Sequence, residues 1–489
     1  MNLGWFDWGF TLLYIVGVFA AGALVKKYIG GISDFLVAGR QMGFTLGLLS
    51  LMCTEIAIIT YMYYAELGYS AGLSALIVAV PPLVAFLIVG KTGFIIRPLL
   101  EMKIMTLPEF FRIKFGPGVQ LYVALLMAVG GVLNFAVFPG VEAQFISTVT
   151  GVPRQYLLLI MVIVLTVSLL YTLVGGMVSV LITNYIQYAL LSAGMVLITI
   201  LGFAKTGWPK IVQSVSAHMG AEGINPFAPS FFRSEFGFHF LVWQILTWVA
   251  TLTSWQAIAI RIFSAKDPKT GTKIFTWSSL MFLSRAVLPI FWGVLAFAYL
   301  GPGENALNAL PKMLALTTPR GLIGIIFASL LAASMSTYSS YLLSWSSVIS
   351  QDLIGAAVRQ IAKREISSRT QILISRVTMT ALMIFIIWWS LFHKVGDYLY
   401  FYLNMTANLF VPGTLAAAAL GIYWKRSRPL GAYVGFTLSA GVTLLYFMPR
   451  HPETSTLGWA SFVLAFAGMI AGSLVQNKIQ PPSPRIIMK

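Results

Sequence analysis

Long apolar runs, separated by short polar segments, follow one another along the whole chain. About 20 apolar residues are enough for a helix to cross the hydrocarbon core of a bilayer. Runs of this length recur thirteen times, and we expect membrane-spanning helices at 8–25, 42–66, 72–96, 119–148, 154–174, 177–204, 236–261, 274–300, 319–349, 370–392, 396–421, 429–448 and 456–476. The pattern predicts an all-α polytopic membrane protein with about 13 transmembrane helices.

The composition leads to the same class of protein. Of the 489 residues, 58% are hydrophobic and 10% are charged. An ordinary soluble domain has about 25% charged residues, because its surface faces water. The composition therefore excludes a soluble globular enzyme and a disordered chain, and it predicts an integral protein of the cell (inner or plasma) membrane. Cys53 is the single cysteine, so an intramolecular disulfide is also excluded.

Lysine and arginine are unevenly distributed between the predicted loops. Most of the 32 basic residues lie in loops that follow odd-numbered spans, and Arg261 is counted among them. Because cytoplasmic loops are enriched in lysine and arginine, we expect the N-terminus outside and the C-terminus in the cytoplasm. This distribution accounts for the net charge of +17 without a nucleic-acid partner.

The longest loop separates two blocks of five spans, and each block opens with an unusual span. Thr54, Glu55 and Thr60 interrupt the first of these spans, and the second carries Thr247, Thr251, Thr253, Ser254 and Gln256. Polar interruptions at corresponding positions of two halves are typical of transporters with inverted repeats and broken helices. Alternatively, these side chains only bond neighbouring helices together.

Five units follow from this division. They are the first span with an inner loop (1–41), inverted repeat 1 with spans 2 to 6 (42–204), an outer loop (205–235), inverted repeat 2 with spans 7 to 11 (236–421), and spans 12 and 13 with a short cytoplasmic tail (422–489).

Few charged residues fall deep inside the predicted spans. Glu55 and Arg285 lie midway through the second and eighth spans, and Glu142 lies nearer one end of the fourth. A charge at the bilayer centre costs about 2.5–3.5 kcal/mol on insertion scales. Such residues either belong to a substrate or ion pathway, or they form a structural pair that neutralises itself.

A small-residue face in the ninth span offers oxygen ligands. Ala333, Ser336 and Thr337 are spaced i, i+3 and i+4, so they share one face of a helix. Two hydroxyls and a backbone carbonyl suit a small hard cation. Alternatively, the hydroxyls bond back to their own helix, as serine and threonine in membrane helices do.

Enzyme chemistry finds no support in the sequence. It contains no catalytic triad pattern, no zinc motif and no glycine-rich loop of the kind that cradles phosphate. We therefore expect a protein that is not an enzyme and that uses no organic cofactor.

Residues 175–187, GGMVSVLITNYIQ, resemble a signature of the sodium/solute symporter family. Residues 106–110, 261–266 and 421–426 agree with the same family. The resemblance implies the leucine-transporter fold, with a five-plus-five inverted repeat formed by spans 2 to 6 and 7 to 11. It also implies a secondary active symporter that moves a small organic solute inward with Na+ as the coupling ion.

The resemblance carries binding positions onto this chain. It places a sodium ion at the backbone carbonyls of Cys53, Ile56 and Ala333 and the hydroxyls of Ser336 and Thr337. It also implies that the substrate is lined by Glu55, Thr60, Trp248, Thr251, Arg285 and Asn404.

Two positions depart from the family pattern. Asn184 marks the ion-exit region, where the family usually has an aspartate that assists sodium release to the cytoplasm. With that acid replaced, Glu55 is the central acid near the site, so proton-coupled symport through Glu55 stays open. Trp248 replaces a smaller polar residue of sugar-transporting members, which makes a sugar symporter the less favoured alternative.

Arg285 suggests the chemistry of the solute. Its planar guanidinium matches a carboxylate through two parallel hydrogen bonds, so we favour a monocarboxylate or an amino acid. Alternatively, Arg285 is permanently paired with Glu55 or Glu142. A transporter-like membrane sensor acting with a partner also remains open. The expected partners are the solute and the lipid bilayer, and we expect the protein to function as a monomer.

Overall fold

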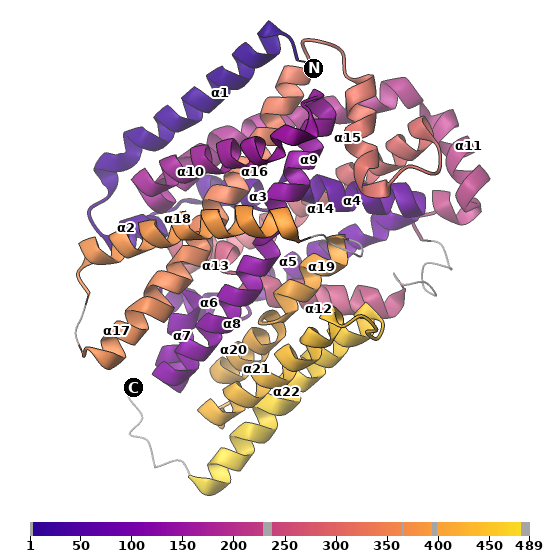
Figure 1. Ribbon diagram of the computed structural model, residues 1–489. Coiled ribbons are helices and arrows are strands. Elements are labelled where there is room, and N and C mark those ends of the chain that lie inside the picture. The colour runs from indigo at the N-terminus through magenta and orange to yellow at the C-terminus, as the bar shows by residue number, and fades with distance from the viewer. Residues whose placement is uncertain (1–2, 228–236, 364–365, 394–398, 481–489) are drawn as a thin grey trace.

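The computed structural model describes residues 3–227, 237–363, 366–393 and 399–480, and these residues fold mainly into helices (Figure 1). The first half of the chain contains α1 (Trp5–Leu24), α2 (Ile32–Val37), α3 (Phe44–Thr54), α4 (Ile58–Ala71), the 3-10 helix η3 (Gly72–Ala79), α5 (Val80–Thr92), α6 (Ile96–Glu101), α7 (Leu107–Phe115), α8 (Pro117–Ala136), α9 (Phe138–Thr150), α10 (Leu157–Thr206) and α11 (Trp208–Met219).

The second half continues the same architecture. It contains α12 (Phe238–Ser254), α13 (Gln256–Ser264), α14 (Pro268–Leu300), α15 (Ala306–Thr317), α16 (Ile323–Ser347), the π-helical segment η7 (Val348–Ile354), α17 (Gly355–Ile361), α18 (Ser368–Phe392), α19 (Leu399–Asn408), α20 (Val411–Tyr423), α21 (Pro429–Leu444) and α22 (Thr454–Ile479).

Nine helices of the described residues are long and apolar enough to cross a membrane, or up to eleven if each of two bent pairs is one span. The expected all-α membrane architecture is therefore confirmed. The number of thirteen spans, the two repeats and the unit boundaries stay predictions. In the expected outer loop 205–235, α11 forms a further helix that packs on α14, and residues 228–236 lie outside the described residues, as does the tail from residue 481.

Both spans with polar interruptions are broken helices. Residues 55–57 separate α3 from α4, and the backbone of Ala57 is extended (φ −124°, ψ 171°). Trp255 separates α12 from α13 with φ −74° and ψ 115°, and the two helices are bent by 51°. The polar residues thus lie at the two breaks, where backbone N–H and C=O groups lack partners within a helix.

The long helix α10 changes direction at Gly176. Its 50 residues exceed a single crossing, and they include both expected spans 154–174 and 177–204. Gly176 has φ 50° and ψ −136°, and a Cβ atom there would lie 2.3 Å from the carbonyl oxygen of Phe35 in α2. Glycine is required here by both the backbone conformation and the close approach of α2.

Small residues allow the central helices to pack closely. A Cβ atom on Gly68 of α4 would lie 1.9 Å from the carbonyl oxygen of Ile290 in α14. One on Gly293 of α14 would lie 2.0 Å from the carbonyl oxygen of Ala65. Helices in a membrane associate through close packing of this kind, because lipid is as apolar as the side chains and burial alone gives no driving force.

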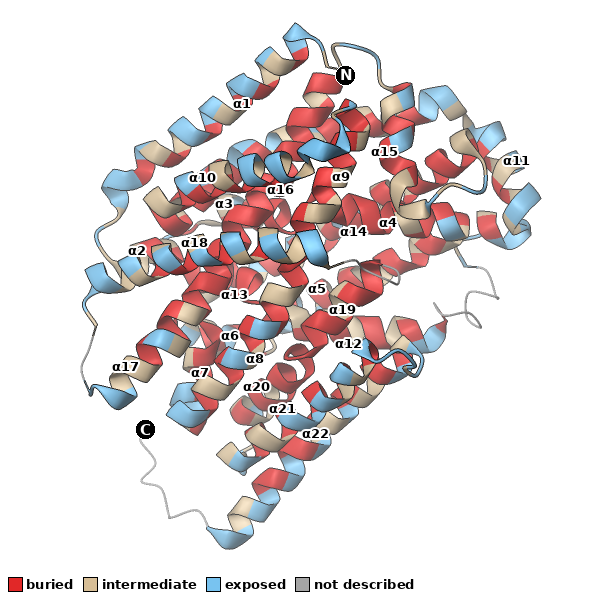
Figure 2. Cartoon of the chain, viewed as in Figure 1, coloured by how far each residue is buried: buried red, intermediate tan, exposed pale blue. Residues whose placement is uncertain are grey.

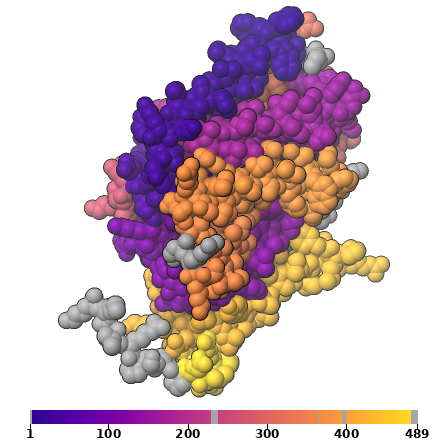
Figure 3. Space-filling view, turned by 60° about the vertical axis from the view of Figure 1, so that its left-hand side comes forward, coloured from indigo at the N-terminus to yellow at the C-terminus, as the bar shows by residue number. Residues whose placement is uncertain are grey.

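The interior is built around α16, and the exterior is apolar. Nearly every residue of α16 is buried, whereas α1 and α18 expose large apolar side chains (Figure 2). Val16 of α1 and Ile384 of α18 are 62% and 61% exposed. Figure 3 shows α1, α10 and α18 side by side on one face of the molecule. An apolar outer face around a polar-lined interior is what a lipid environment requires.

We predict that Gly176→Ala lowers the free energy of unfolding by about 2 kcal/mol, because alanine strains this backbone conformation and meets the Phe35 carbonyl. Thermal unfolding of the purified protein, followed by tryptophan fluorescence, measures the change. Gly17→Ala is the control, since Gly17 lies in α1 with no atom within 4 Å of its Cβ position. Equal unfolding temperatures for the two variants would contradict the assignment of strain to the bend.

Candidate functional site

The two helix breaks meet at one cavity. The cavity has a volume of about 110 Å³ and is lined by residues of α3, α4, α8, α9, α12, α14, α16 and α19. The sequence predicted six substrate residues, and all of them line this cavity: Glu55, Thr60, Trp248, Thr251, Arg285 and Asn404. The fold therefore brings together residues that lie up to 349 positions apart in the chain.

Further residues that line the cavity were not predicted, among them Tyr63, Asn134, Phe138, Trp255, Tyr341 and Tyr400. Most of these six are aromatic, and aromatic residues are spread over all predicted spans of this chain, so composition alone could not single them out. Only Trp255 carried a local signal, because it adjoins the polar residues that interrupt its span.

Arg285 is held inside the cavity wall by backbone and phenol groups. Its Nε donates to the carbonyl oxygen of Glu55 at 2.5 Å, its Nη2 to the hydroxyl of Tyr63 at 3.0 Å and its Nη1 to the hydroxyl of Tyr64 at 3.4 Å. In the described part of the chain the ion pairs are Arg112 with Glu109 and Lys312 with Glu304. The alternative of a permanent Arg285 ion pair with Glu55 or Glu142 is therefore wrong.

Three aromatic rings surround the same guanidinium. Its Cζ atom lies 5.1 Å from the ring centre of Phe282, 5.5 Å from that of Trp248 and 5.7 Å from that of Tyr64. The negative faces of such rings attract a cation. Trp248 thus contributes a ring face to the surroundings of the buried guanidinium.

Glu55 lies in the break between α3 and α4. The residue is 7% exposed, and its Oε1 atom has no hydrogen-bond partner among the described residues. A buried carboxylate oxygen without a donor is costly. The cavity therefore presents both a guanidinium and an acceptor that lacks a partner.

Four of the five predicted sodium ligands converge beside the cavity. Ser336 Oγ donates to the carbonyl oxygen of Cys53 at 2.8 Å and to that of Ala333 at 2.7 Å. Thr337 Oγ1 donates to the carbonyl oxygens of Thr54 at 2.8 Å and Ala333 at 3.2 Å. The hydroxyls thus bond both to their own helix and to the end of α3. Ile56 is buried two residues further on, outside this set of hydrogen bonds.

The converging groups fit a small cation. They are neutral hydroxyl and carbonyl oxygens, which are the ligands that hard cations prefer. The carbonyls of Cys53 and Thr54 belong to the C-terminal end of α3, where the helix dipole places partial negative charge, and that of Ala333 belongs to α16.

Arg261 was counted among the residues of the inner loops, and this expectation is wrong. It lies in α13 and is 2% exposed, not in a solvated loop. Its Nε donates to Ser50 Oγ at 3.1 Å, and its Nη2 donates to Ser340 Oγ at 2.7 Å and to Thr54 Oγ1. Because α13 is buried after the break at Trp255, Arg261 lies inside the protein. The hydroxyls of Ser50, Thr54 and Ser340 accept its hydrogen bonds.

Asn184 of α10 lies against the same group. With its amide oriented so that both atoms are satisfied, its oxygen accepts from Arg261 Nη2 at 3.3 Å and from Ser50 Oγ and Thr54 Oγ1 at 3.1 Å. Its nitrogen then donates to the carbonyl oxygen of Val180 at 3.2 Å. Its assignment to the ion-exit region stays a prediction.

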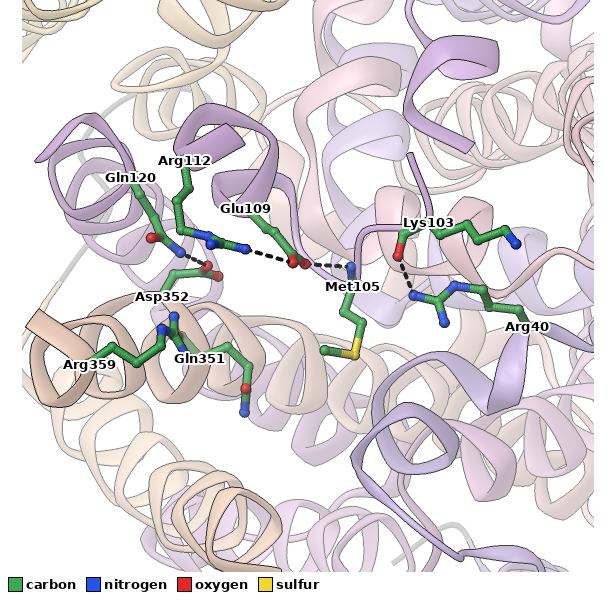
Figure 4. A network of polar contacts seen from close by, with 9 residues as sticks. All are labelled: Arg40, Lys103, Met105, Glu109, Arg112, Gln120, Gln351, Asp352 and Arg359. Atoms are coloured by element: carbon green, nitrogen blue, oxygen red, sulfur yellow. Dashed lines mark hydrogen bonds and ion pairs between the residues drawn. The ribbon is translucent and has the colours of Figure 1, made fainter. Parts of the chain in front are cut away.

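A polar network lies on the face that contains α7, the start of α8 and η7 (Figure 4). Gln120 Nε2 donates to Asp352 Oδ1 at 2.8 Å, and Arg112 pairs with Glu109 at 3.3 Å. Glu109 also accepts from the backbone N–H of Met105 at 3.0 Å. Asp352 is 1% exposed, and the sequence analysis did not single it out because it follows a predicted span. Gln120 thus ties the start of α8 to η7, and Glu109 ties α7 to the segment after α6.

Comparison with known proteins places the chain in a family. A model of the sodium:solute symporter family matches residues 35–438. The chain belongs to this family. It is 23% identical to the sodium/glucose cotransporter of Vibrio parahaemolyticus, with 94% of this chain and 89% of the relative covered. It is 25% identical to the sodium/mannose cotransporter of Bos taurus, with 77% of this chain and 71% of the relative covered.

The solved structures support the fold. The structure of a substrate-bound, outward-open Na+-coupled sialic acid symporter resembles this symporter with a TM-score of 0.82 at 18% identity, over 99% of both chains. The leucine-transporter fold that the sequence resemblance implied is confirmed. The family is one of membrane transporters, so this chain is an integral membrane transport protein.

We predict that Cys53 resists a bulky, membrane-impermeant maleimide in the folded protein. Its side chain is 0% exposed at the end of α3, so labelling needs local opening and should be on the order of a hundred-fold slower than in the unfolded chain. Mass spectrometry after timed labelling measures the rate. Protein unfolded in detergent is the control and should take up one label. Fast labelling of the folded protein would show that the end of α3 is open.

Proposed function

We propose that this protein moves a small organic solute into the cell together with Na+, by secondary active symport. The observation that carries the proposal is the meeting of two broken helices at one cavity, with an oxygen cluster directly beside it. Discontinuous helices supply both the solute site and the ion site in transporters of this kind. The distribution of basic residues supports an outer N-terminus and a cytoplasmic C-terminus.

The proposed ion site joins α3 to α16. The carbonyl oxygens of Cys53 and Ala333 and the hydroxyl oxygens of Ser336 and Thr337 would coordinate a sodium ion. The carbonyl oxygen of Ile56 completes the set that the family resemblance implies. The two hydroxyls now donate to the carbonyls, and on ion binding they would turn their lone pairs to the ion. One sodium ion moving down a potential of 100 mV supplies about 2.3 kcal/mol for solute uptake.

Arg285 supports a solute that carries a carboxylate. A guanidinium has five N–H groups, and three hydrogen bonds of Arg285 are accounted for by Glu55, Tyr63 and Tyr64. The remaining N–H groups suit a carboxylate oxygen, since charge-assisted bonds are the stronger kind. The unpartnered Glu55 oxygen suits an ammonium group. We therefore favour an amino acid, and after it a monocarboxylate.

A neutral sugar is the second candidate. The relatives named above are sodium/glucose and sodium/mannose cotransporters. Thr60, Thr251 and Asn404 give the cavity hydroxyl and amide groups that suit sugar hydroxyls. A sugar has no carboxylate to bind the remaining N–H groups of Arg285, which is why it ranks second.

We predict that sodium raises the melting temperature of the wild type and that Ser336→Ala with Thr337→Ala removes most of the shift. A ligand at 100 times its dissociation constant stabilises the folded state by about 2.7 kcal/mol. Thermal unfolding in sodium chloride and in choline chloride measures the shift in melting temperature.

Ser344→Ala with Ser346→Ala is the matched control, because these hydroxyls of α16 donate to carbonyl oxygens of their own helix, those of Ser340 and Leu343. A sodium shift retained by the first double variant would move the ion site elsewhere. If neither protein responds to sodium and uptake follows a pH gradient, proton coupling through Glu55 replaces the sodium proposal.

We predict that Arg285→Lys weakens binding of the transported carboxylate solute by about ten- to a hundred-fold, because lysine keeps the charge and loses the fork of parallel donors. Thermal shift against L-alanine, L-proline, lactate, glucose and mannose identifies the solute, and uptake into proteoliposomes gives the apparent affinity. The sodium shift should be retained.

Arg376→Lys is the control, since Arg376 of α18 lies outside the cavity and donates to the carbonyl oxygen of Leu173 at 2.7 Å. Stabilisation by glucose or mannose alone, with unchanged affinity in Arg285→Lys, would establish the sugar candidate instead.

A further inference from the structure

Two buried charges stand at the facing ends of the broken helix, and neither serves the proposed solute or ion site. A helix carries partial negative charge at its C-terminus and partial positive charge at its N-terminus. Arg261 lies at the end of α3, and Glu142 lies at the start of α4. Each residue is 2% exposed, and neither takes part in the ion pairs found among the described residues.

Arg261 joins three helices on one side of the break. It belongs to α13, bonds to Ser50 and Thr54 of α3, and bonds to Ser340 of α16. Its Nη1 also donates to the carbonyl oxygen of Ala257 at 2.6 Å, within α13. The positive charge therefore faces the negative end of α3 and ties it to both neighbours.

Further contacts make α3 and α13 one unit. Met42, just before α3, forms a short bridge with Ala265, just after α13: its N–H donates to the carbonyl oxygen of Ser264 at 3.0 Å, and its carbonyl oxygen accepts from Lys266 at 3.1 Å. In the proposed orientation both helices are the cytoplasmic halves of their broken spans. Arg261 thus lies where the cytoplasmic halves of the two broken spans meet.

Glu142 joins three helices on the other side of the break. It belongs to α9, and its Oε1 accepts from the backbone N–H of Ile59, the second residue of α4, at 3.2 Å. Its Oε2 accepts from the hydroxyl of Tyr338 in α16 at 2.7 Å. The negative charge therefore faces the positive end of α4, the outer half of the same span.

The two charges reach α16 two residues apart, within one helical turn. Glu142 holds Tyr338, and Arg261 holds Ser340, while the proposed ion ligands Ser336 and Thr337 directly precede them. Each charge contacts one half of the broken helix and leaves the other half free of it. Because each half is held by its own residue, one half can loosen while the other stays in place.

We propose that Arg261 and Glu142 are positioning residues of opposite sign, Arg261 for the cytoplasmic half α3 and Glu142 for the outer half α4. Loss of Arg261 loosens α3 and α13 and leaves α4 in place. Loss of Glu142 loosens α4 and leaves α3 in place. Only the assignment of the two halves to the cytoplasmic and outer sides rests on the proposed function; the contacts of Arg261 and Glu142 do not.

Hydrogen–deuterium exchange of the full chain in sodium-free buffer tests the proposal. In Arg261→Met we expect amides of α3 and α13 to exchange about ten-fold faster or more, with α4 unchanged. In Glu142→Gln we expect the same increase in the first turns of α4, with α3 and α13 unchanged. Faster exchange in both halves with either variant, or in neither half, would overturn the proposal.

Two controls separate the loss of these contacts from the loss of a charge elsewhere in the helix bundle. Arg376→Met removes a guanidinium of α18, and Asp352→Asn neutralises the buried carboxylate of η7. Neither residue contacts the break, so exchange in α3 and α4 should stay at the wild-type rate. If Arg261→Met does not fold, Arg261→Lys takes its place, and the charge it keeps should give an intermediate increase confined to α3 and α13.

A sided measurement uses the single native thiol. Arg261→Met should let an impermeant maleimide reach Cys53 from the cytoplasmic face of membrane vesicles, whereas Glu142→Gln should not. Labelling of Arg261→Met from the outer face only would overturn the assignment of α3 to the cytoplasmic half. The sodium-induced rise in melting temperature is measured separately. An error in the proposed ion site and an error in the positioning roles of Arg261 and Glu142 therefore give different results.

Discussion

The break between α3 and α4 leaves backbone groups without helical partners in the middle of the molecule, and the rest of the site is arranged to satisfy them. Lipid supplies no hydrogen bonds, so every such group needs a partner inside the protein. The carbonyl oxygens of Cys53 and Thr54 accept from Ser336 and Thr337, and that of Glu55 accepts from Arg285. The N–H of the following segment is satisfied as well: Ala57 donates to Thr60 Oγ1 at 3.2 Å.

This constraint explains why α16 is buried along its length and rich in small polar residues. Its hydroxyls reach across to α3 only because small side chains let the helices approach closely. The same hydroxyls bond back to α16 itself, as Ser336 does to Ala333, so they stay satisfied when a partner moves away. A site that exchanges its partners without leaving groups unpaired is suited to binding and releasing an ion.

The buried charges follow the same logic. Arg285 and Arg261 bind carbonyl and hydroxyl oxygens, and Glu142 binds a backbone N–H and a phenol. Because these charges hold the ends of half-helices and not each other, the described residues contain no ion pair at the centre of the site. Arg285 therefore keeps N–H groups available toward the cavity, and Glu55 keeps an oxygen there without a partner.

Local patterns in the sequence determined the class of the protein and much of the site. Apolar runs of membrane-crossing length specify helices in lipid, polar interruptions such as Glu55 mark where a helix breaks, and the i, i+3, i+4 spacing puts Ser336 and Thr337 on one face. Each of these features depends on residues a few positions apart, so it can be read from the chain itself.

Only the tertiary structure decided the surroundings of Arg261 and Glu142. In the sequence Arg261 is one basic residue at the end of an apolar run, as lysines and arginines of cytoplasmic loops are, and Glu142 is one acid near a span end. Their partners lie 211 positions away, at Ser50, and 83 positions away, at Ile59. Whether a charge faces water or the end of a broken helix depends on how distant helices pack, and no local pattern records that.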